Sequence, residues 1–249
     1  PISGRFTLDL LVGTYTVRVS HPYHQMVEIP VEVLEGETTE IAAALDPFAG
    51  LPGELAYDDG TAETARAIGA PDSGFAVRMS PEPGRTVMVT GARVRLWGTD
   101  WPAPGGNSFQ VAVYDSQPDG SPGRLLLGPI RVDNAVRGAW NEVDLRPYGL
   151  TVQGDFYLAV LQTEDYPYVP GVAFDETTTQ GRTWYVLDTT VFEPFDSPGN
   201  AMIRALISTE MAPPVILSPA DGTFTNQTEV LVEGTSPPNV TVTLYVNGA

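Results

Sequence analysis

Hydrophobic and polar residues alternate in short runs along the first 48 residues of this chain. The alternation is clearest at 14–20 and 27–34, where every second residue is apolar, and it recurs at 5–11 and 38–45. A period of two places successive side chains on opposite faces of a β-strand. Four such runs predict a small antiparallel sheet in residues 1–48.

The same pattern continues through residues 52–210, where turn-forming Gly, Pro, Asp and Asn clusters separate short apolar runs. Amphipathic helical spacing is scarce there. The predicted strands are 54–57, 62–67, 74–79, 87–98, 108–114, 125–132, 138–145, 155–163, 172–174, 183–187 and 201–207. Strands of this number and length predict two packed antiparallel sheets, a jelly-roll β-sandwich. The tripeptide Leu51-Pro52-Gly53 is predicted to be the linker before it.

A third β-rich segment occupies residues 213–249, after the stiff dipeptide Pro213-Pro214. The run 215–225 leads into predicted strands at 229–234 and 240–246. This order resembles the start of a bacterial Ig-like repeat, and the later strands of such a repeat are not present. The fold class is therefore all-β: a central jelly-roll sandwich flanked by partial β-domains at 1–48 and 213–249. Such a chain is interpreted as a piece of a longer multidomain protein.

Composition narrows the classes of function. Glycine (25) and proline (23) are abundant, which suits short strands joined by tight turns. Acidic residues (31) outnumber basic ones (13), giving a net charge of −18, so binding to nucleic-acid phosphates is disfavoured. No apolar run approaches the length of a membrane span. Cysteine is absent, which favours a bacterial or archaeal secreted or cell-surface protein, although a cytosolic protein also fits.

Three short motifs near the N-terminus carry a family resemblance. They are Gly4-Arg5-Phe6, Leu11-Val12-Gly13-Thr14-Tyr15-Thr16-Val17 and Gly36-Glu37-Thr38-Thr39-Glu40-Ile41. Together they resemble the carboxypeptidase-regulatory-like, prealbumin-type β-sandwich. Two earlier strands of that family have no counterpart in these residues. The resemblance implies a structural spacer with no chemistry of its own.

The central segment carries a second resemblance. Its motifs are the run from Glu54 to Glu63, the strand Gly74-Phe75-Ala76-Val77-Arg78-Met79, the strand Val111-Ala112-Val113-Tyr114-Asp115 with the Asp-Gly-Ser-Pro-Gly turn after it, and Phe156-Tyr157-Leu158-Ala159-Val160. They resemble the jelly-roll module behind the catalytic domain of bacillopeptidase F-like subtilases. The resemblance implies a non-catalytic module with a catalytic domain upstream in the same polypeptide.

Two tripeptides resemble fragments of subtilase catalytic motifs. Asp72-Ser73-Gly74 matches the motif of the acid, and Gly234-Thr235-Ser236 matches the start of the serine motif. A subtilase needs a histidine between them, but His21 and His24 precede both. Without a base the serine stays protonated and weakly nucleophilic, so both matches are interpreted as chance and no catalytic residue is assigned. The two histidines lack a third metal ligand and are interpreted as residues of a surface turn.

An acidic cluster gives a candidate metal site. Its residues are Asp58, Asp59, Thr61, Glu63 and, further along the chain, Asp175. Carboxylate and hydroxyl oxygens suit Ca²⁺, and jelly-roll modules often hold a structural Ca²⁺ where a terminal strand meets a loop. No EF-hand spacing is present, so unliganded acidic turns remain the alternative. Ca²⁺, if bound, would hold loops together; no other cofactor is expected.

Aromatic residues give a candidate ligand surface. Trp101, Tyr166 and Tyr168 lie beside Pro and Gly in predicted loops, where flat aromatic faces can stack on sugar rings. Trp140 and Trp184 lie on predicted strands and are expected to fill the sandwich core.

These observations predict a non-catalytic accessory or spacer region of a secreted bacterial serine peptidase. It would position the enzyme or bind its protein or polysaccharide substrate. The alternative is a carbohydrate- or matrix-binding module of another secreted hydrolase. Exposed aromatic residues in one concave patch would favour that alternative, and buried ones would favour the spacer.

Overall fold

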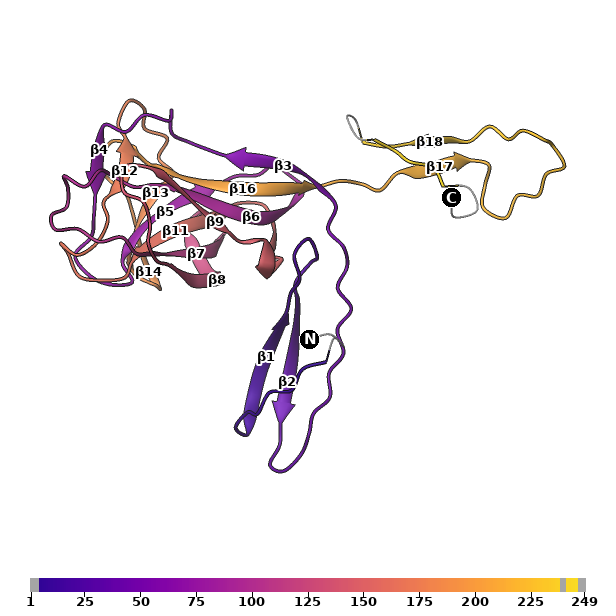
Figure 1. Ribbon diagram of the computed structural model, residues 1–249, viewed down its shortest axis with the longest axis horizontal. Helices are drawn as coiled ribbons and strands as arrows, with labels where there is room; N and C mark the ends of the chain where they lie inside the picture. The colour runs from indigo at the N-terminus through magenta and orange to yellow at the C-terminus, as the bar shows by residue number, and fades with distance from the viewer. Residues whose placement is uncertain (1–4, 238–240, 246–249) are drawn as a thin grey trace. The chain divides into compact units, whose positions relative to one another are not determined.

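A computed structural model describes residues 5–237 and 241–245. The chain forms two compact units, Pro1–Thr209 and Glu210–Ala249 (Figure 1). Secondary structure is almost entirely β, and the prediction of an all-β sandwich is confirmed. No helix among the described residues is long and apolar enough to cross a bilayer.

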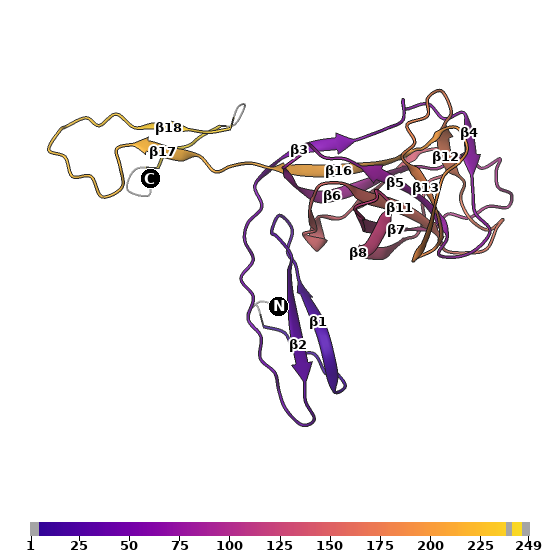
Figure 2. The same ribbon diagram turned by 180° about the vertical axis from the view of Figure 1, so that it is seen from behind.

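Two antiparallel sheets face each other in the first unit. The six-stranded sheet has the order β14 (Val191–Pro194), β13 (Thr183–Asp188), β5 (Gly74–Met79), β11 (Phe156–Gln162), β7 (Phe109–Ser116), β8 (Pro122–Val132). The five-stranded sheet has the order β10 (Thr151–Gln153), β6 (Thr86–Arg95), β16 (Ile203–Glu210), β3 (Gly50–Leu55), with β9 (Trp140–Asp144) also on β6. Strands β3 and β16 run side by side in both views (Figures 1 and 2).

Short elements complete this unit. A three-stranded sheet has the order β15 (Asn200–Ala201), β12 (Val172–Asp175), β4 (Thr64–Arg66), and a 3₁₀ turn spans Arg146–Tyr148. Each strand predicted in residues 52–210 has a counterpart in the structure, although the run predicted at 201–207 is divided between β15 and β16, and β10 and β14 are additional. The two additional strands are short, with few apolar positions, so alternation could not reveal them.

Strand β11 lies at the centre of the six-stranded sheet and is buried along its whole length. Phe156, Leu158 and Val160 face the five-stranded sheet and join the main core. Tyr157 and Leu161 face the other way, into a second apolar cluster. A strand covered on both faces has a continuous apolar sequence, as this one has. Each large side chain buried here contributes about 1.5–3 kcal/mol to folding.

The second cluster covers the outer face of the six-stranded sheet. Ala76, Ala159 and Ala112 are direct cross-strand neighbours on β5, β11 and β7. The large rings on this face form edge-to-face pairs, Tyr114 with Phe192 at 5.0 Å and Tyr157 with Trp184 at 6.0 Å between centroids. The prediction that Trp184 fills the core between the sheets is therefore wrong: the strand alternation places it on the outer face, in this aromatic layer.

Trp140 is also outside the main core. It lies half-buried on β9, with the guanidinium of Arg204 4.4 Å and that of Arg93 5.5 Å from its ring centre. The inward-facing residue of this strand is Val143. The prediction of a core Trp140 is wrong because cation–π contacts between two arginines and the ring hold it on the outer face of the five-stranded sheet.

The N-terminal segment contains one hairpin, β1 (Gly13–Val19) paired with β2 (Val27–Val33). The other two strands predicted there, at 5–11 and 38–45, are absent, and Gly4 lies outside the described residues. Alternation alone does not make a strand, because the backbone also needs a neighbouring strand to pair with, and Phe6 and Leu11 remain exposed.

The hairpin segment joins the sandwich through a backbone hydrogen bond, in which Met26 N–H donates to the carbonyl of Gly149. Within the segment, Phe48 N–H donates to the carbonyl of Tyr23. The predicted linker Leu51-Pro52-Gly53 lies within strand β3. Proline is tolerated there because β3 is an edge strand with one side free of pairing.

In the described residues of the second unit, β17 (Val215–Ser218) pairs with β18 (Glu233–Thr235). The strand predicted at 229–234 begins later than expected. Of the strand predicted at 240–246, residues 240 and 246 lie outside the described residues, and 241–245 form no strand.

Candidate functional site

Two loops of the sandwich bring candidate aromatic residues together. The rings of Trp101 and Tyr166 lie 6.3 Å apart at a tilt of 46°. Tyr166 is 48% exposed, and Tyr168, two residues further along the same loop, is 60% exposed. We call these three residues the aromatic loop surface.

Arg137 fixes the loop that carries Trp101. Its Nη2 donates to the carbonyls of Gly98 at 2.8 Å and Pro102 at 2.9 Å, and its Nη1 donates to Pro104 at 3.3 Å. A charged donor with three carbonyl acceptors holds an irregular backbone in one conformation. Sequence reasoning did not find Arg137, because nothing in the sequence links it to a loop so far away.

Gly171 makes room for the indole ring. A Cβ at this position would lie 2.8 Å from the ring of Trp101. Gly106 lies against the backbone of the loop that carries Tyr168, so close that a Cβ on Gly106 would overlap the carbonyl of Tyr168. The half-exposed indole and the exposed phenol rings thus stand on a braced support and can offer flat apolar faces to a ligand.

The predicted acidic cluster divides into two parts. Asp59, Glu63 and Asp175 are linked by threonine hydroxyls. The hydroxyl oxygen of Thr61 lies 2.6 Å from the carboxylate of Asp59 and 2.9 Å from that of Glu63, and the hydroxyl oxygen of Thr177 lies 2.6 Å from Asp175 and 3.1 Å from Asp59. Backbone N–H groups add to this network, with Asp59 N–H donating to Asp175 at 3.1 Å.

Asp58 belongs to the second part. Its carboxylate accepts hydrogen bonds from Nε and Nη2 of Arg204, and it also accepts the N–H of Gly60. The structure therefore brings four of the five predicted metal-site residues together and directs Asp58 to an arginine.

Hydrogen bonds hold these carboxyl groups in the charged form. The hydroxyl and N–H of Thr61 lower the pKa of Asp59. Burial opposes ionisation of Asp175, but hydrogen bonds from Thr177 and from the N–H of Asp59 outweigh it, and the pKa is lowered. Among the described residues, no group of three or more His, Asp or Glu is arranged to hold a metal ion. Calcium binding at this cluster stays a prediction.

The tripeptides that resemble catalytic motifs have no catalytic geometry. Ser73 is buried, and its hydroxyl donates to the backbone carbonyl of Ala70. Gly234 and Thr235 lie in strand β18, and the described residues that follow, 236–237 and 241–245, form no helix. His21 and His24 lie in a turn, where each Nδ1 is 3.0 Å from the carbonyl of Pro22.

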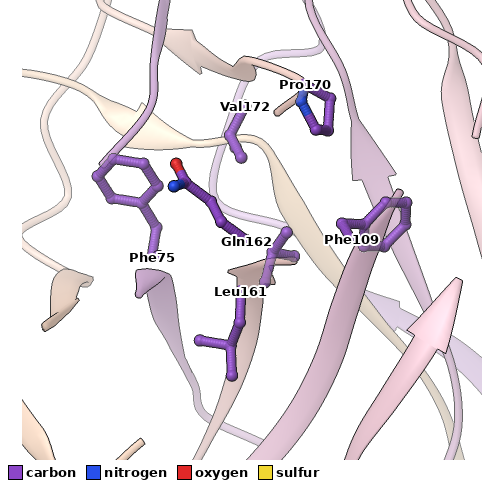
Figure 3. Close-up of a pocket in the computed structure, with 8 residues that line it drawn as sticks. Phe75, Phe109, Leu161, Gln162, Pro170 and Val172 are labelled. Carbon is purple, nitrogen blue, oxygen red and sulfur yellow. The ribbon is translucent and has the colours of Figure 1, made fainter. Parts of the chain in front are cut away.

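A small internal cavity lies at one end of the sandwich (Figure 3). Phe75, Phe109 and Val172 are among its lining residues, and its volume of about 10 Å³ has room for about one water molecule. The amide of Gln162 is hydrogen-bonded to the backbone N–H and carbonyl of Ile68. The cavity is too small for a ligand and its polar group is already paired.

Comparison with known proteins gives one strong sequence match. No family model matches the chain. The chain is 43% identical over 246 residues to bacillopeptidase F of Bacillus subtilis (strain 168), an alignment that covers 97% of this chain and 17% of that protein. The resemblance of the central motifs to bacillopeptidase F is thus confirmed. The chain spans about a sixth of the length of this relative.

Two solved structures show a slight likeness. The clostridial cysteine protease Cwp84 after propeptide cleavage aligns with 66% of this chain and 42% of its own, with a TM-score of 0.47 and 12% identity. The cysteine protease and lectin-like domains of Cwp84, a surface layer associated protein of Clostridium difficile, align with 66% of this chain and 37% of their own, with a TM-score of 0.43 and 13% identity. These values are too low to define a shared fold.

Proposed function

We propose that this chain is a non-catalytic accessory region of a secreted bacterial serine peptidase, and that it positions the enzyme or binds its substrate. The observation that carries the proposal is the 43% identity to a segment that makes up 17% of bacillopeptidase F. A match to so small a share of the relative fits a region outside the catalytic domain. The backbone-bound hydroxyl of Ser73 supports the same assignment.

The test compares the longer polypeptide with and without residues 52–210. A positioning role predicts that hydrolysis of a short soluble peptide keeps its kcat/KM, while hydrolysis of an insoluble protein substrate falls several-fold. If the polypeptides with and without residues 52–210 hydrolyse each substrate at the same rate, the proposal is refuted. An equal loss of activity on the soluble peptide and on the insoluble protein would also refute it, because the region would then be required for folding of the enzyme. The isolated chain should hydrolyse neither substrate.

A second candidate function is binding of a carbohydrate or matrix polymer. The observation that favours it is the proximity of Trp101 and Tyr166 on two braced loops, with Tyr168 two residues further along and both tyrosines exposed. Aromatic faces stack on the apolar CH faces of sugar rings, and a rigid support limits the entropy lost on binding.

Affinity electrophoresis in gels that contain soluble polysaccharides tests this function. The chain should be retarded by its polysaccharide, and the triple variant with Trp101, Tyr166 and Tyr168 changed to Ala should not. Phe224→Ala is the matched control, since Phe224 is 98% exposed and lies in the other unit. Retardation that survives the triple variant, or none by any polysaccharide tested, would remove the aromatic loop surface from consideration as a sugar site.

A further inference from the structure

A groove of about 400 Å³ lies on the outer face of the five-stranded sheet, within the size range of ligand sites in proteins. Its floor is formed by β3, β6, β9 and β16, and its wall includes the rings of Tyr23 and Phe48. Tyr23 is 51% exposed and Phe48 is buried. The groove involves no residue of the aromatic loop surface or the acidic cluster.

Two of the charges in this groove neutralise each other. Nε and Nη2 of Arg146 donate to the two carboxylate oxygens of Asp144, at 2.8 and 2.9 Å. Nη1 of Arg146 donates to the Tyr23 hydroxyl at 3.0 Å. These hydrogen bonds lower the pKa of Asp144 and raise that of Arg146. The pair also fixes the ring of Tyr23 at the edge of the groove.

Two arginines further along the same face, Arg93 and Arg204, are also paired. Arg93 donates to Glu54 at 3.0 Å, although the register places it directly opposite Glu142. Arg204 is bound to Asp58 and lies 3.6 Å from Glu54. The positive charges of these two arginines are thus matched by the negative charges of Glu54 and Asp58.

Among the charged residues of the groove lining, Glu142 is the one that the pair of Asp144 and Arg146 leaves over. It lies exposed on β9 in the lining of the groove, and within the described part of the chain its carboxylate has neither a hydrogen bond nor an ion pair. An unpaired carboxylate attracts a cationic group, and the aromatic rings that line the same groove offer apolar surface to the stem of that group. The net charge of −18 raises the local concentration of cationic ligands.

We propose that this groove binds a lysine or arginine side chain of an extended polypeptide. Glu142 is its counter-ion, and the rings of Tyr23 and Phe48 contact its aliphatic stem. The hydroxyls of Thr90 and Ser208, also in the lining, are acceptors for further N–H donors of the ligand.

The probe is a fluorescent tetralysine peptide with blocked ends, and its binding to the chain is measured by fluorescence anisotropy. The control peptide carries acetyl groups on all four lysine Nζ atoms, which removes the charge and keeps the stems. The chain should bind the lysine peptide and not the acetylated one. Equal binding of both peptides would overturn the proposal, since the charge would then play no part.

Two variants of equal charge locate the site. Glu142→Gln should weaken binding about fivefold, as expected for a partly exposed ion pair. Glu193→Gln removes the same charge from β14 of the other sheet and should leave affinity unchanged within about twofold. An equal loss in both variants would mean that binding reflects only the overall negative charge and would overturn the proposal, as would no loss in either.

A variant of the wall provides an independent readout. Tyr23→Ser removes the ring and should also weaken binding, while the thermal midpoint checks that the variant remains folded. In ¹⁵N-labelled chain, the lysine peptide should shift the amide signals of the groove strands β6, β9 and β16. Shifts confined to the loops of Trp101 and Tyr166 would place the peptide on the aromatic loop surface and overturn the assignment.

Discussion

Arg204 holds the carboxylate of Asp58 with two guanidinium nitrogens, across a sequence separation of 146 residues. The Asp58 side chain is 1% exposed and that of Arg204 16%. The same guanidinium lies over the ring of Trp140. One arginine on β16 thus joins the turn after β3 to the outer face of the sheet. It also explains why Asp58 stands apart from the other carboxylates of the predicted metal site, which all follow it in the sequence.

Removal of either Asp58 or Arg204 alone should therefore lower the free energy of unfolding more than removal of both. Asp58→Ala leaves a largely buried guanidinium without its main partner and should lower the free energy of unfolding by about 3 kcal/mol. Urea unfolding of Asp58→Ala, Arg204→Met and the double variant measures the coupling. Additive losses from the two single variants would show that the pair contributes no interaction energy.

The calcium prediction can now be tested residue by residue. Ca²⁺ that binds only the folded chain should raise the midpoint of thermal unfolding relative to EDTA. Since Asp175 lies in the threonine-linked network and Asp58 does not, Asp175→Asn should abolish this rise and Asp58→Asn should preserve it. Identical midpoints in Ca²⁺ and EDTA would show that the carboxylates are unliganded turn residues, held by Thr61 and Thr177 alone.

The sandwich was predictable from sequence where burial is strongest. Strand β5 matches its prediction to the residue, because turns bound a run that is buried at nearly every position. The runs 5–11 and 38–45 show the limit of the method. Their alternation is a property of the sequence, whereas a strand also requires a partner, which the pattern does not encode.

Contacts between distant parts of the chain were not predictable. The sequence indicated that Trp101, Tyr166 and Tyr168 lie in loops, but Arg137 and Gly171, which support Trp101, carry no local signal. The groove beside Glu142 was missed for the same reason, since its lining comes from the N-terminal segment and from strands far along the chain.

The support of the aromatic loop surface can be tested at Gly171. In Gly171→Ala the new Cβ would approach the Trp101 ring to 2.8 Å, so the ring or its loop must move. Overpacking of this kind costs about 1–3 kcal/mol. We expect a lower thermal midpoint and a shift in tryptophan emission. Gly181→Ala is not a suitable control because its φ is positive, but Gly69→Ala is suitable, since a Cβ there would meet nothing within 4 Å. Unchanged emission in Gly171→Ala would show that Trp101 does not depend on Gly171.

The two buried tyrosines of the outer aromatic layer, Tyr114 and Tyr157, should ionise at a higher pH than a tyrosine in the unfolded chain. Burial raises the pKa of Tyr114 to about 12, helped by the charges of Asp188 and Asp72, and burial likewise raises that of Tyr157 to about 12. An unfolded tyrosine has a pKa of about 10. Between these values the folded chain binds more protons than the unfolded one, so stability is fully present below pH 10 and falls as the pH rises towards 12.

Absorbance of tyrosinate at 295 nm, followed against pH, should show two phenols that ionise well after the exposed ones. Tyr157→Phe should remove one late phenol and reduce the fall in stability between pH 10 and 12. It also removes the hydrogen bond that Tyr157 donates to Gly120, so its stability at neutral pH provides the baseline. Tyr168→Phe is the matched control, because Tyr168 is 60% exposed. If all phenols ionise together near pH 10 while the chain is folded, the aromatic layer is open to solvent and does not form a second core.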